Sequence, residues 1–406
     1  MDKFGLLGRK LGHSFSPQIH NLLGDYEYLL YEKEPNEVGE FVVNGSLKGF
    51  NITIPYKETV IPYCTDLSDT VKKIGSVNTI VKKDGRTEGH NTDYYGFTFL
   101  LKNAGIDPEG KKAVILGSGG SSKTAYAALS DMGSRSITVI SRSGENNYEN
   151  IYKHYDAEII VNTTPVGMFP KNGEKPVDLE KFTKCIGVAD IIYNPANTAL
   201  LLQAKKLGIK YTNGLPMLVA QAKKASEIFF DSVIDDSVIP DIVGKIEKQT
   251  KNIALIGMPG CGKSSIGKAL AEMLGREFIE TDLLIPEKAG KSISEIFSED
   301  GEDVFRNIET EVLGDCSKKS GTVISTGGGI VTRERNLDLL KQNSTVVFLD
   351  RDLTVLPSEG RPLTQKYGIA ELAEKRMPIY RSWCDIAFKC IGVRETAELI
   401  RKELML

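Results

Sequence analysis

The chain has 406 residues, of which 41% are hydrophobic and 26% are charged. At roughly 100–200 residues per domain this length predicts two to four domains, and the composition excludes a chain that is disordered throughout. The 51 basic and 54 acidic side chains nearly cancel, which excludes a broad basic surface for nucleic acid and a polybasic membrane anchor. No apolar stretch approaches the roughly 20 residues that span a bilayer. We therefore expect small-molecule ligands, with no nucleic acid, membrane or protein partner implied.

Six cysteines are scattered without a CxxC pair, and the chain has only four histidines. This pattern argues against a disulfide framework or a zinc site and fits the reducing cytoplasm. The opening residues MDKFGLLGRK contain a short apolar run that predicts a strand rather than a signal peptide. With so few histidines, we expect lysines and carboxylates to carry proton transfer.

The predicted elements fall into three modules. Short apolar segments at residues 49–55 and 77–81 predict strands in a first α/β module, residues 1–104. A second module, residues 105–215, opens with an apolar strand, a glycine turn and an alanine-rich helix. Residues 216–245 predict helices whose partner the sequence leaves open, and we expect them to return to the first module.

Residues 234–250 predict a surface helix that leads into a linker at residues 246–251. A third module, residues 252–406, again opens with an apolar strand, a glycine loop and a helix, which is typical of parallel α/β units. The predicted fold class is thus α/β throughout. A Rossmann-like domain follows the N-terminal α/β domain, and a phosphate-loop domain with a parallel sheet, like that of nucleoside-monophosphate kinases, completes the chain.

The first glycine turn reads Gly117-Ser118-Gly119-Gly120-Ser121, between a strand and a helix. Such turns let backbone amides approach a pyrophosphate at the positive end of a helix, although many α/β folds use them only for packing. The next strand ends in Ser141-Arg142, where proteins that bind NAD usually carry an acid. An arginine at this position suits the 2′-phosphate of NADP, and its alternative is a solvated surface side chain.

Several polar residues precede this turn on short loops. Ser14 and Ser16 share one loop, Thr53 and Lys57 follow a strand together with Asn51, and Asp93 closes another. Taken singly, each fits a turn or a helix cap, Ser16 and Asp93 above all. Together they supply hydroxyls, an amide, an ammonium and a carboxylate, which is the inventory for binding a hydroxylated acid.

Seven ordered motifs in residues 1–245 resemble the shikimate dehydrogenase family: GHSFSPQIHN, GFNITIPYKE, GSVNTI, GHNTDYYGF, GSGGSS, IIVNTTPVGM and NGLPMLVAQA. The resemblance implies NADPH-dependent reduction of 3-dehydroshikimate to shikimate, with Lys57 and Asp93 as the catalytic pair. It further implies a substrate-binding set and an NADP-binding set. The first comprises Ser14, Ser16, Thr53, Lys57, Asn78, Asp93, Tyr193 and Gln221, and the second comprises Gly117, Ser118, Gly119, Gly120, Ser121, Ser141, Arg142, Ile191, Gly214 and Met217.

The motifs depart from the family pattern at a few positions. His90 stands where aspartate is usual, Pro216 where glycine is usual, and the Asn-Arg-Thr of the 2′-phosphate site is Ser141-Arg142-Ser143. The arginine is retained, so NADP remains the expected cofactor. The quinate/shikimate dehydrogenases, which use NAD more readily, share most of these motifs and are the nearest alternative.

The second glycine loop fits the full phosphate-loop pattern, Gly257-x4-Gly262-Lys263-Ser264, after an apolar strand. In this pattern backbone amides cradle phosphates, the lysine reaches the β and γ groups, and the serine hydroxyl meets magnesium. A glycine-rich turn with an incidental lysine is the alternative. The pattern specifies a nucleotide and leaves its acceptor open.

Candidate acceptor residues follow later strands and helices. Glu280-Thr-Asp282 ends one strand, and residues 327–329 are three consecutive glycines after another. Arg306 and Glu309 share a helix face, which is equally consistent with a surface ion pair. Further arginines at 361 and 376 suit a carboxylate, which guanidinium grips at two points.

In order, GMPGCGKSS, ETD, IFSEDGEDVFRNIE, STGGGIV, GRPL and KRMPIY resemble the shikimate kinase family over residues 250–406. The resemblance implies Asp282 as the group that orients or deprotonates the 3-hydroxyl, with Lys263 also catalytic. The implied shikimate-binding residues are Asp282, Arg306, Gly328, Gly329 and Arg376. The implied ATP-binding residues are Gly260, Cys261, Gly262, Lys263, Ser264, Ser265 and, on the lid, Arg361; magnesium would meet Ser264, and Glu280 through water.

Two features depart from the kinase pattern. Glu280 replaces the first acid of the family's DxD, and residues 352–360 form a short segment that lacks an arginine often found before RPL. We expect a bifunctional shikimate dehydrogenase and shikimate kinase that uses NADP(H) and Mg-ATP, on the route to chorismate and the aromatic amino acids. The alternatives are a kinase for another small acceptor, such as gluconate or a nucleoside monophosphate, and a non-catalytic domain that binds nucleotide to regulate the dehydrogenase.

Overall fold

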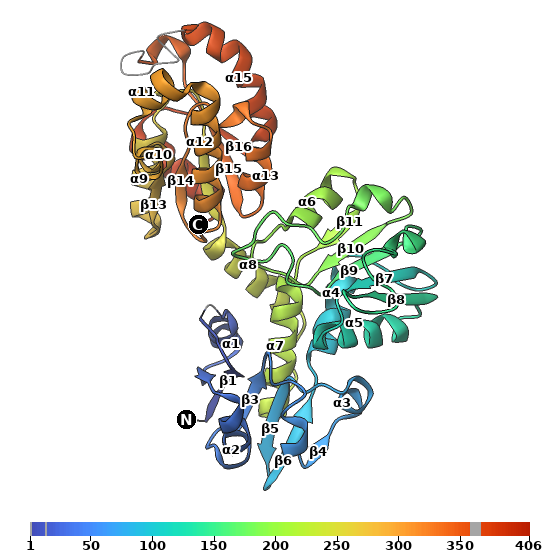
Figure 1. The fold of residues 1–406 in the computed structure, drawn as a ribbon. Coiled ribbons are helices and arrows are strands. Elements are labelled where there is room, and N and C mark those ends of the chain that lie inside the picture. The colour runs from blue at the N-terminus through green and yellow to red at the C-terminus, as the bar shows by residue number, and fades with distance from the viewer. Residues whose placement is uncertain (1, 13, 358–366) are drawn as a thin grey trace. The chain divides into compact units, whose positions relative to one another are not determined.

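The computed structural model describes residues 2–12, 14–357 and 367–406, which form two compact units (Figure 1). The first unit comprises Met1–Gly167, Glu174–Tyr193 and Gln203–Lys245, and the second comprises Met168–Gly173, Asn194–Leu202 and Ile246–Leu406. Within the described residues, no helix combines the length and the apolar character needed to cross a bilayer.

The first unit contains a mixed six-stranded sheet of order β2-β1-β3-β5-β6-β4. Strand β1 runs parallel to β2 and β3, whereas β5 pairs antiparallel with β3 and β6. The strands are β1 (Lys3–Gly8), β2 (Glu27–Glu32), β3 (Gly49–Ile52), β4 (Asp66–Leu67), β5 (Thr79–Lys83) and β6 (Arg86–His90), with helices α1 (Ser16–Leu23), α2 (Val38–Asn44) and α3 (Asp69–Ile74) between them. The carboxyl ends of β1 and β3 lie side by side, and the segments that follow them hold Ser14, Ser16 and Lys57.

A second, all-parallel sheet in the same unit has the order β11-β10-β9-β7-β8. Its strands β9 and β10 are buried along their whole length, as expected where helices cover both faces of a parallel sheet. The strands are β7 (Lys112–Leu116), β8 (Ser136–Ile140), β9 (Ile159–Asn162), β10 (Gly187–Asp190) and β11 (Lys210–Thr212), with helices α5 (Gly120–Asp131) and α6 (Ala199–Lys206).

Two helices, α4 (Asp93–Asn103) and α7 (Leu215–Phe230), pack closely against each other within this unit. Helix α7 also contacts α1 and β5, and the ring of Phe229 stacks on that of Phe4 at 4.7 Å. Residues 215–230 therefore pack against the elements of the first sheet.

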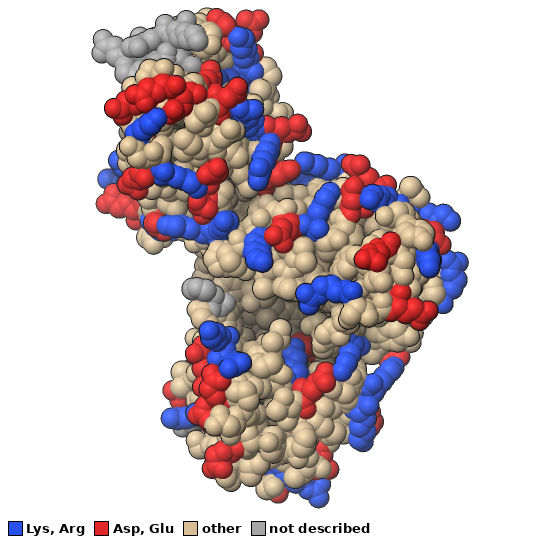
Figure 2. All heavy atoms as spheres, viewed as in Figure 1, with Lys and Arg blue, Asp and Glu red and all other residues tan. Residues whose placement is uncertain are grey.

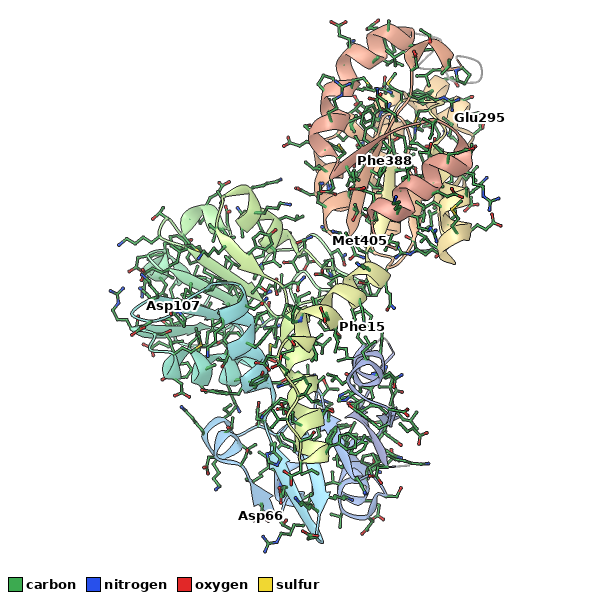
Figure 3. The ribbon with its side chains drawn as sticks, turned by 180° about the vertical axis from the view of Figure 1, so that it is seen from behind. Phe15, Asp66, Asp107, Glu295, Phe388 and Met405 are labelled. Carbon is green, nitrogen blue, oxygen red and sulfur yellow. The ribbon has the colours of Figure 1, made fainter. Side chains whose placement is uncertain are left out.

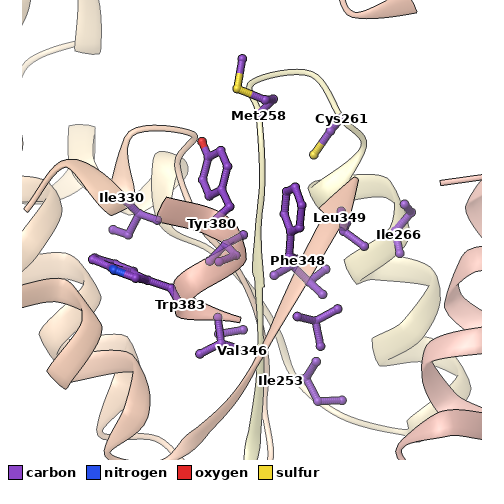
Figure 4. Packing of buried hydrophobic residues seen from close by; sticks show 14 of the residues in the cluster. Ile253, Met258, Cys261, Ile266, Ile330, Val346, Phe348, Leu349, Tyr380 and Trp383 are labelled. Carbon is purple, nitrogen blue, oxygen red and sulfur yellow. The ribbon is translucent and has the colours of Figure 1, made fainter. Parts of the chain in front are cut away.

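The second unit is built on a five-stranded parallel sheet of order β13-β14-β12-β15-β16. The strands are β12 (Asn252–Ile256), β13 (Phe278–Glu280), β14 (Val323–Ser325), β15 (Ser344–Asp350) and β16 (Ile386–Lys389). The helices are α9 (Lys263–Leu274), α10 (Thr281–Ala289), α11 (Ile293–Glu295), α12 (Glu302–Ser317), α13 (Arg335–Lys341), α15 (Ile369–Trp383) and α16 (Val393–Glu403). Around β12 and β15 lies an apolar core, in which the rings of Phe348 and Tyr380 stack at 5.4 Å (Figure 4).

The expected linker at residues 246–251 is largely helical. Helix α8 (Val238–Thr250) continues through it, and only Lys251 separates α8 from β12. Ile239, Ile242 and Ile246 are buried, so one apolar face of the helix continues up to residue 246. The many acidic residues and lysines of residues 234–250 indicated the exposed face of this helix but gave no sign of its buried face.

Candidate functional sites

A cavity of about 360 Å³ in the first unit is lined by all eight residues that the dehydrogenase resemblance assigns to the substrate. A recess between the parts of the unit that hold the two sheets is visible in Figure 2. The lining includes Ser14, Ser16, Thr53, Lys57, Asn78, Asp93, Tyr193 and Gln221, together with Lys10 and Asn51. Loops that follow β1, β3 and β6 thus converge with α7 on one pocket.

Lys57 and Asp93 form an ion pair in this cavity. The Lys57 Nζ donates to Asp93 Oδ2 at 2.6 Å, and the two side chains are only 19% and 11% exposed. Asp93 is the first residue of α4, where the helix dipole favours a carboxylate. Neither Ser16 nor Asp93 caps a helix, because both lie just inside one. The pair can supply a proton to a bound oxygen and hold the donor in place.

Hydrogen bonds fix the neighbouring amides. The Asn78 Oδ1 accepts from the Thr92 backbone N–H at 2.7 Å, and Asn78 Nδ2 donates to Thr92 Oγ1 at 3.0 Å. The Thr92 hydroxyl in turn donates to Gln221 Oε1 at 3.3 Å. Behind them, the Tyr28 hydroxyl donates to Asn51 Oδ1 at 2.7 Å. The polar wall of the cavity is therefore held in a single arrangement.

Tyr193 and the serine loop complete the cavity. The ring of Tyr193 lies 5.6 Å from that of Phe15, the residue labelled at the start of α1 in Figure 3. Burial raises the pKa of the Tyr193 hydroxyl, so it remains a hydrogen-bond donor at neutral pH. Ser14 Oγ accepts from the Ser16 backbone N–H at 3.2 Å, which leaves the Ser14 hydroxyl proton available to a ligand.

A larger cavity of about 1110 Å³ adjoins the first and is lined by the first glycine turn. Thr53, Lys57 and Ser121 line both cavities, so Lys57 stands where the two meet. Of the residues assigned to NADP, Gly117, Ser118, Gly119, Gly120, Ser121, Ser141 and Arg142 line this larger cavity, whereas Ile191, Gly214 and Met217 line the smaller one.

Local geometry accounts for the residue types at positions 214 and 216. A Cβ at Gly214 would lie 1.9 Å from the carbonyl oxygen of Ile191, so no larger residue fits there. Pro216 stands in the first turn of α7, where a helix tolerates proline because that N–H has no partner within the helix. The departure at Pro216 is thus compatible with the fold.

Sequence reasoning missed several residues of the larger cavity, namely Tyr148, Thr163, Thr164, Val166 and Lys175. Tyr148 lies near Arg142, and burial raises the pKa of its hydroxyl although the arginine charge opposes the effect. Thr163, Thr164 and Val166 belong to the motif IIVNTTPVGM, which was recognised without a role for its residues. Nothing in the sequence singled out Tyr148 or Lys175.

The phosphate loop of the second unit borders a cavity of about 560 Å³. Its lining includes Gly260, Gly262, Lys263, Ser264, Ser265 and Glu280. Lys263 Nζ donates to the carbonyl oxygens of Gly257 and Met258 at 2.9 and 3.0 Å, and the Ser264 hydroxyl donates to Glu280 Oε1. Cys261 does not line the cavity, because its side chain is buried in the apolar core (Figure 4). Only the Cys261 backbone could therefore meet a nucleotide.

The far part of this cavity gathers Asp282, Arg306, Gly328, Gly329 and Arg376. Arg306 Nη1 donates to Glu309 Oε2 at 2.7 Å, and both side chains are almost completely buried. Their pairing is therefore not the surface ion pair that remained open from the sequence, and Glu309 joins the lining. Arg376 Nη1 donates to the Gly328 carbonyl oxygen at 3.1 Å. The Tyr380 hydroxyl donates to the same oxygen.

Electrostatics set the state of the buried acids. Burial raises the pKa of Asp282, and so does the charge of Glu280, while the charges of Lys263 and Arg306 lower it. Burial also raises the pKa of Glu309, against the effect of Arg306. A carboxyl with a raised pKa is a better proton acceptor, which suits a general base.

The last two expected features are the lid arginine and the magnesium site. Arg361 lies outside the described residues. Among the described residues, no three His, Cys, Asp or Glu side chains gather into a metal-binding group. The hydroxyl of Ser264 beside the carboxylate of Glu280 is nevertheless the oxygen-donor set that suits Mg²⁺ bound mainly by water and phosphate.

Comparison with known proteins identifies both halves. Residues 6–80 match the family model of the shikimate dehydrogenase substrate binding domain, and residues 259–404 match that of shikimate kinase. The chain is 38% identical over 271 residues to the shikimate dehydrogenase (NADP(+)) of Clostridium beijerinckii, a match that covers 62% of this chain and 100% of that protein. The chain belongs to the shikimate dehydrogenase family. Its C-terminal part is a shikimate kinase domain, so the protein is a bifunctional oxidoreductase and kinase.

Solved structures agree with this assignment of the shikimate dehydrogenase part. Shikimate dehydrogenase 1 from Peptoclostridium difficile is 38% identical, with a TM-score of 0.56, and the match covers 61% of this chain and 98% of that one. Quinate dehydrogenase from Corynebacterium glutamicum, in complex with NAD, is 26% identical with a TM-score of 0.55, covering 59% and 98%.

Proposed function

We propose that the N-terminal half reduces 3-dehydroshikimate to shikimate with NADPH, and that the C-terminal half phosphorylates shikimate to shikimate 3-phosphate with Mg-ATP, towards chorismate and the aromatic amino acids. The observation that carries the dehydrogenase proposal is the Lys57–Asp93 ion pair of 2.6 Å at the junction of the two cavities of the first unit. A proton donor placed between a substrate pocket and a dinucleotide pocket is what ketone reduction requires.

In the dehydrogenase half, bound NADPH supplies the hydride. Lys57 donates its proton to the ketone oxygen as negative charge develops there, and Asp93 holds the ammonium group in position. Ser14, Ser16, Thr53, Asn78, Tyr193 and Gln221 bind the hydroxyls and the carboxylate of the substrate. Arg142, just after β8, favours the 2′-phosphate of NADP, in keeping with the cofactor in the name of the Clostridium beijerinckii relative.

In the kinase half, Asp282 orients the 3-hydroxyl of shikimate and accepts its proton, for which the raised pKa suits it. Arg306 and Arg376 bind the carboxylate, with Gly328 and Gly329 close to the ring. Lys263 reaches the β and γ phosphates, and the lid arginine Arg361 neutralises charge on the transferred group. Magnesium, held by Ser264 and through water by Glu280, supplies charge neutralisation on the phosphates.

Selective inactivation of the two halves tests this assignment. Lys57→Ala should lower 3-dehydroshikimate-dependent oxidation of NADPH by about 10²–10⁴-fold, the usual contribution of a general acid, and leave phosphorylation of added shikimate unchanged. Lys263→Ala should do the reverse. The exposed lysines Lys102 and Lys402, which line neither described site, provide the matched controls Lys102→Ala and Lys402→Ala.

The loss of both activities in Lys57→Ala would refute independent sites. A substrate panel separates the remaining alternatives. A chain that prefers quinate and NAD would be a quinate/shikimate dehydrogenase. The similarity to the quinate dehydrogenase from Corynebacterium glutamicum favours this alternative. ADP formed only with gluconate or a nucleoside monophosphate would reassign the kinase acceptor, and no acceptor-dependent ADP would indicate a regulatory domain.

A further inference from the structure

The substrate cavity of the first unit carries one charge that the proposed chemistry leaves unused. Of the described residues that line it, only Lys10, Lys57 and Asp93 are charged. The Lys57–Asp93 ion pair is internally neutral, so the positive charge of the lining comes from Lys10. An anionic substrate that enters this cavity therefore meets an excess of one positive charge.

Lys10 has no ion pair among the described residues. Two nearby acidic residues, Glu34 and Glu32, bind other groups. Glu34 pairs with Arg9 at 2.9 Å, and Glu32 Oε1 accepts the backbone N–H of Leu11 at 2.6 Å. Arg9 and Leu11, the residues on either side of Lys10, thus bind the carboxylates of Glu34 and Glu32. The Lys10 ammonium remains available to a ligand in the cavity.

The position of Lys10 relates it to one end of the substrate. Lys10 and Ser14 lie on the loop between β1 and α1, Ser16 is the first residue of α1, and all three line only the substrate cavity. Thr53, Lys57 and Ser121 also line the dinucleotide cavity, so the ketone must lie on their side. The carboxylate of 3-dehydroshikimate is on a different ring carbon from the ketone, and it then falls towards the loop of Lys10.

We propose that Lys10 binds the substrate carboxylate, beside the hydroxyls of Ser14 and Ser16, and sets the preference of the dehydrogenase for an anionic substrate. This inference rests on the proposed dehydrogenase function. A charge-assisted bond from an ammonium group to a carboxylate is stronger than a bond between neutral groups, although the exposure of Lys10 weakens it. Because the contact is the same before and during hydride transfer, Lys10 acts on binding and not on the chemical step.

Two substrates that differ only at the carboxylate test the proposal in the full chain. With NADP⁺ and no ATP, oxidation of shikimate and of its neutral methyl ester is measured for the wild type, Lys10→Met, Lys10→Arg and the control Lys102→Met. Lys10→Met should lower kcat/KM for shikimate about tenfold, through KM with kcat nearly unchanged, and leave kcat/KM for the ester as it was. Lys10→Arg should retain most of the preference, and Lys102→Met should behave as the wild type.

An equal loss of kcat/KM on both substrates in Lys10→Met would show a structural role and overturn the proposal, as would an unchanged preference for shikimate. Retained kcat/KM for the ester reports that the dehydrogenase unit of the variant has folded. If the wild-type chain oxidises neither substrate, the proposed dehydrogenase function fails and this inference with it. An active wild type with an unaffected Lys10→Met contradicts the inference alone.

Discussion

At the scale of single residues, the same chemical device serves both halves. Each candidate site combines a lysine with a carboxylate: Lys57 pairs with Asp93, and Lys263 lines the same cavity as Asp282. The surroundings differ, because Asp93 is held by a direct ion pair whereas burial raises the pKa of Asp282. One carboxylate is therefore suited to hold a proton donor and the other to accept a proton.

The raised pKa of Asp282 predicts the pH dependence of the kinase. As the pH falls, the base is protonated and activity is lost, and a raised pKa moves this loss to a higher pH than the ordinary value of about 3.9 would give. Asp282→Asn should lower kcat by about 10²–10⁴-fold. The measurement is kcat/KM for shikimate between pH 4 and 8, and a profile that stays flat down to pH 4 would exclude Asp282 as the base.

Arg142 predicts the choice of dinucleotide. Its removal in Arg142→Ser should raise KM for NADPH by about 10–100-fold, because a hydrogen bond to a charged group contributes about 1.5–3 kcal/mol, and should leave the use of NADH unchanged. Steady-state kinetics with both cofactors checks this. Arg135→Ser is a suitable control, since Arg135 pairs with Glu158 and lines neither cavity. Equal losses with NADPH and NADH would place Arg142 away from the 2′-phosphate.

At the scale of elements, the glycines after β14 let a helix side chain enter the kinase cavity. A Cβ at Gly329 would lie 2.0 Å from the Nη1 of Arg306, which extends from α12, and one at Gly328 would lie 2.6 Å from Pro259 of the phosphate loop. The triple glycine therefore makes room for the guanidinium on one side and for the loop on the other.

Gly329→Ala should displace the Arg306 guanidinium from its place beside Glu309. Because Arg306 is proposed to bind the shikimate carboxylate, KM for shikimate should rise about tenfold or more while KM for ATP stays within about twofold, since loss of a charged hydrogen bond costs about 1.5–3 kcal/mol. Kinase kinetics with each substrate varied in turn checks this. Equal increases in both KM values would show that the whole loop has moved.

His20 on α1 predicts an acid-sensitive element in the dehydrogenase. The ring is completely buried, stacks on Tyr28 at 3.8 Å and has its pKa lowered by burial to about 3. The folded state binds no proton there between pH 6.5 and about 3 while the unfolded state does, so stability falls as the pH falls through this window. From pH 7 to 5 the loss is about 2 kcal/mol, at 1.36 kcal/mol per pH unit below 6.5.

The test compares urea-dependent loss of dehydrogenase activity at pH 7 and pH 5. His20→Phe keeps an aromatic ring against Tyr28 and removes the titration, so its midpoint should change less between the two pH values than that of the wild type. A wild-type midpoint that is the same at both values would contradict the buried neutral histidine.

Sequence reasoning reached different depths at different elements. Strand–glycine–helix junctions were predictable because a short apolar run is followed directly by a glycine-rich turn, as at residues 114–120 and 253–262. The burial of the Arg306–Glu309 pair and the inward side chain of Cys261 depend on contacts with distant elements, which no local pattern encodes. Tyr148 and Lys10 escaped notice as binding candidates for the same reason, since their neighbours in space are far apart in sequence.

At the scale of the whole molecule, one chain carries two proposed reactions in which the product of the first is the substrate of the second. Acidic and basic side chains are interspersed over the face seen in Figure 2, as the near-neutral charge predicted. The order of the motifs and a helix that ends at residue 250 could be predicted from the sequence, whereas the burial of Ile239, Ile242 and Ile246 on one face of α8 could not.

Together, the two proposed activities mean that this single chain makes shikimate and phosphorylates it. The most direct test supplies the purified chain with 3-dehydroshikimate, NADPH, ATP and Mg²⁺ and identifies the products by mass spectrometry. We expect shikimate 3-phosphate, which should be absent when either nucleotide is omitted. Accumulation of shikimate without its phosphate would contradict the kinase assignment, and unchanged 3-dehydroshikimate would contradict the dehydrogenase assignment.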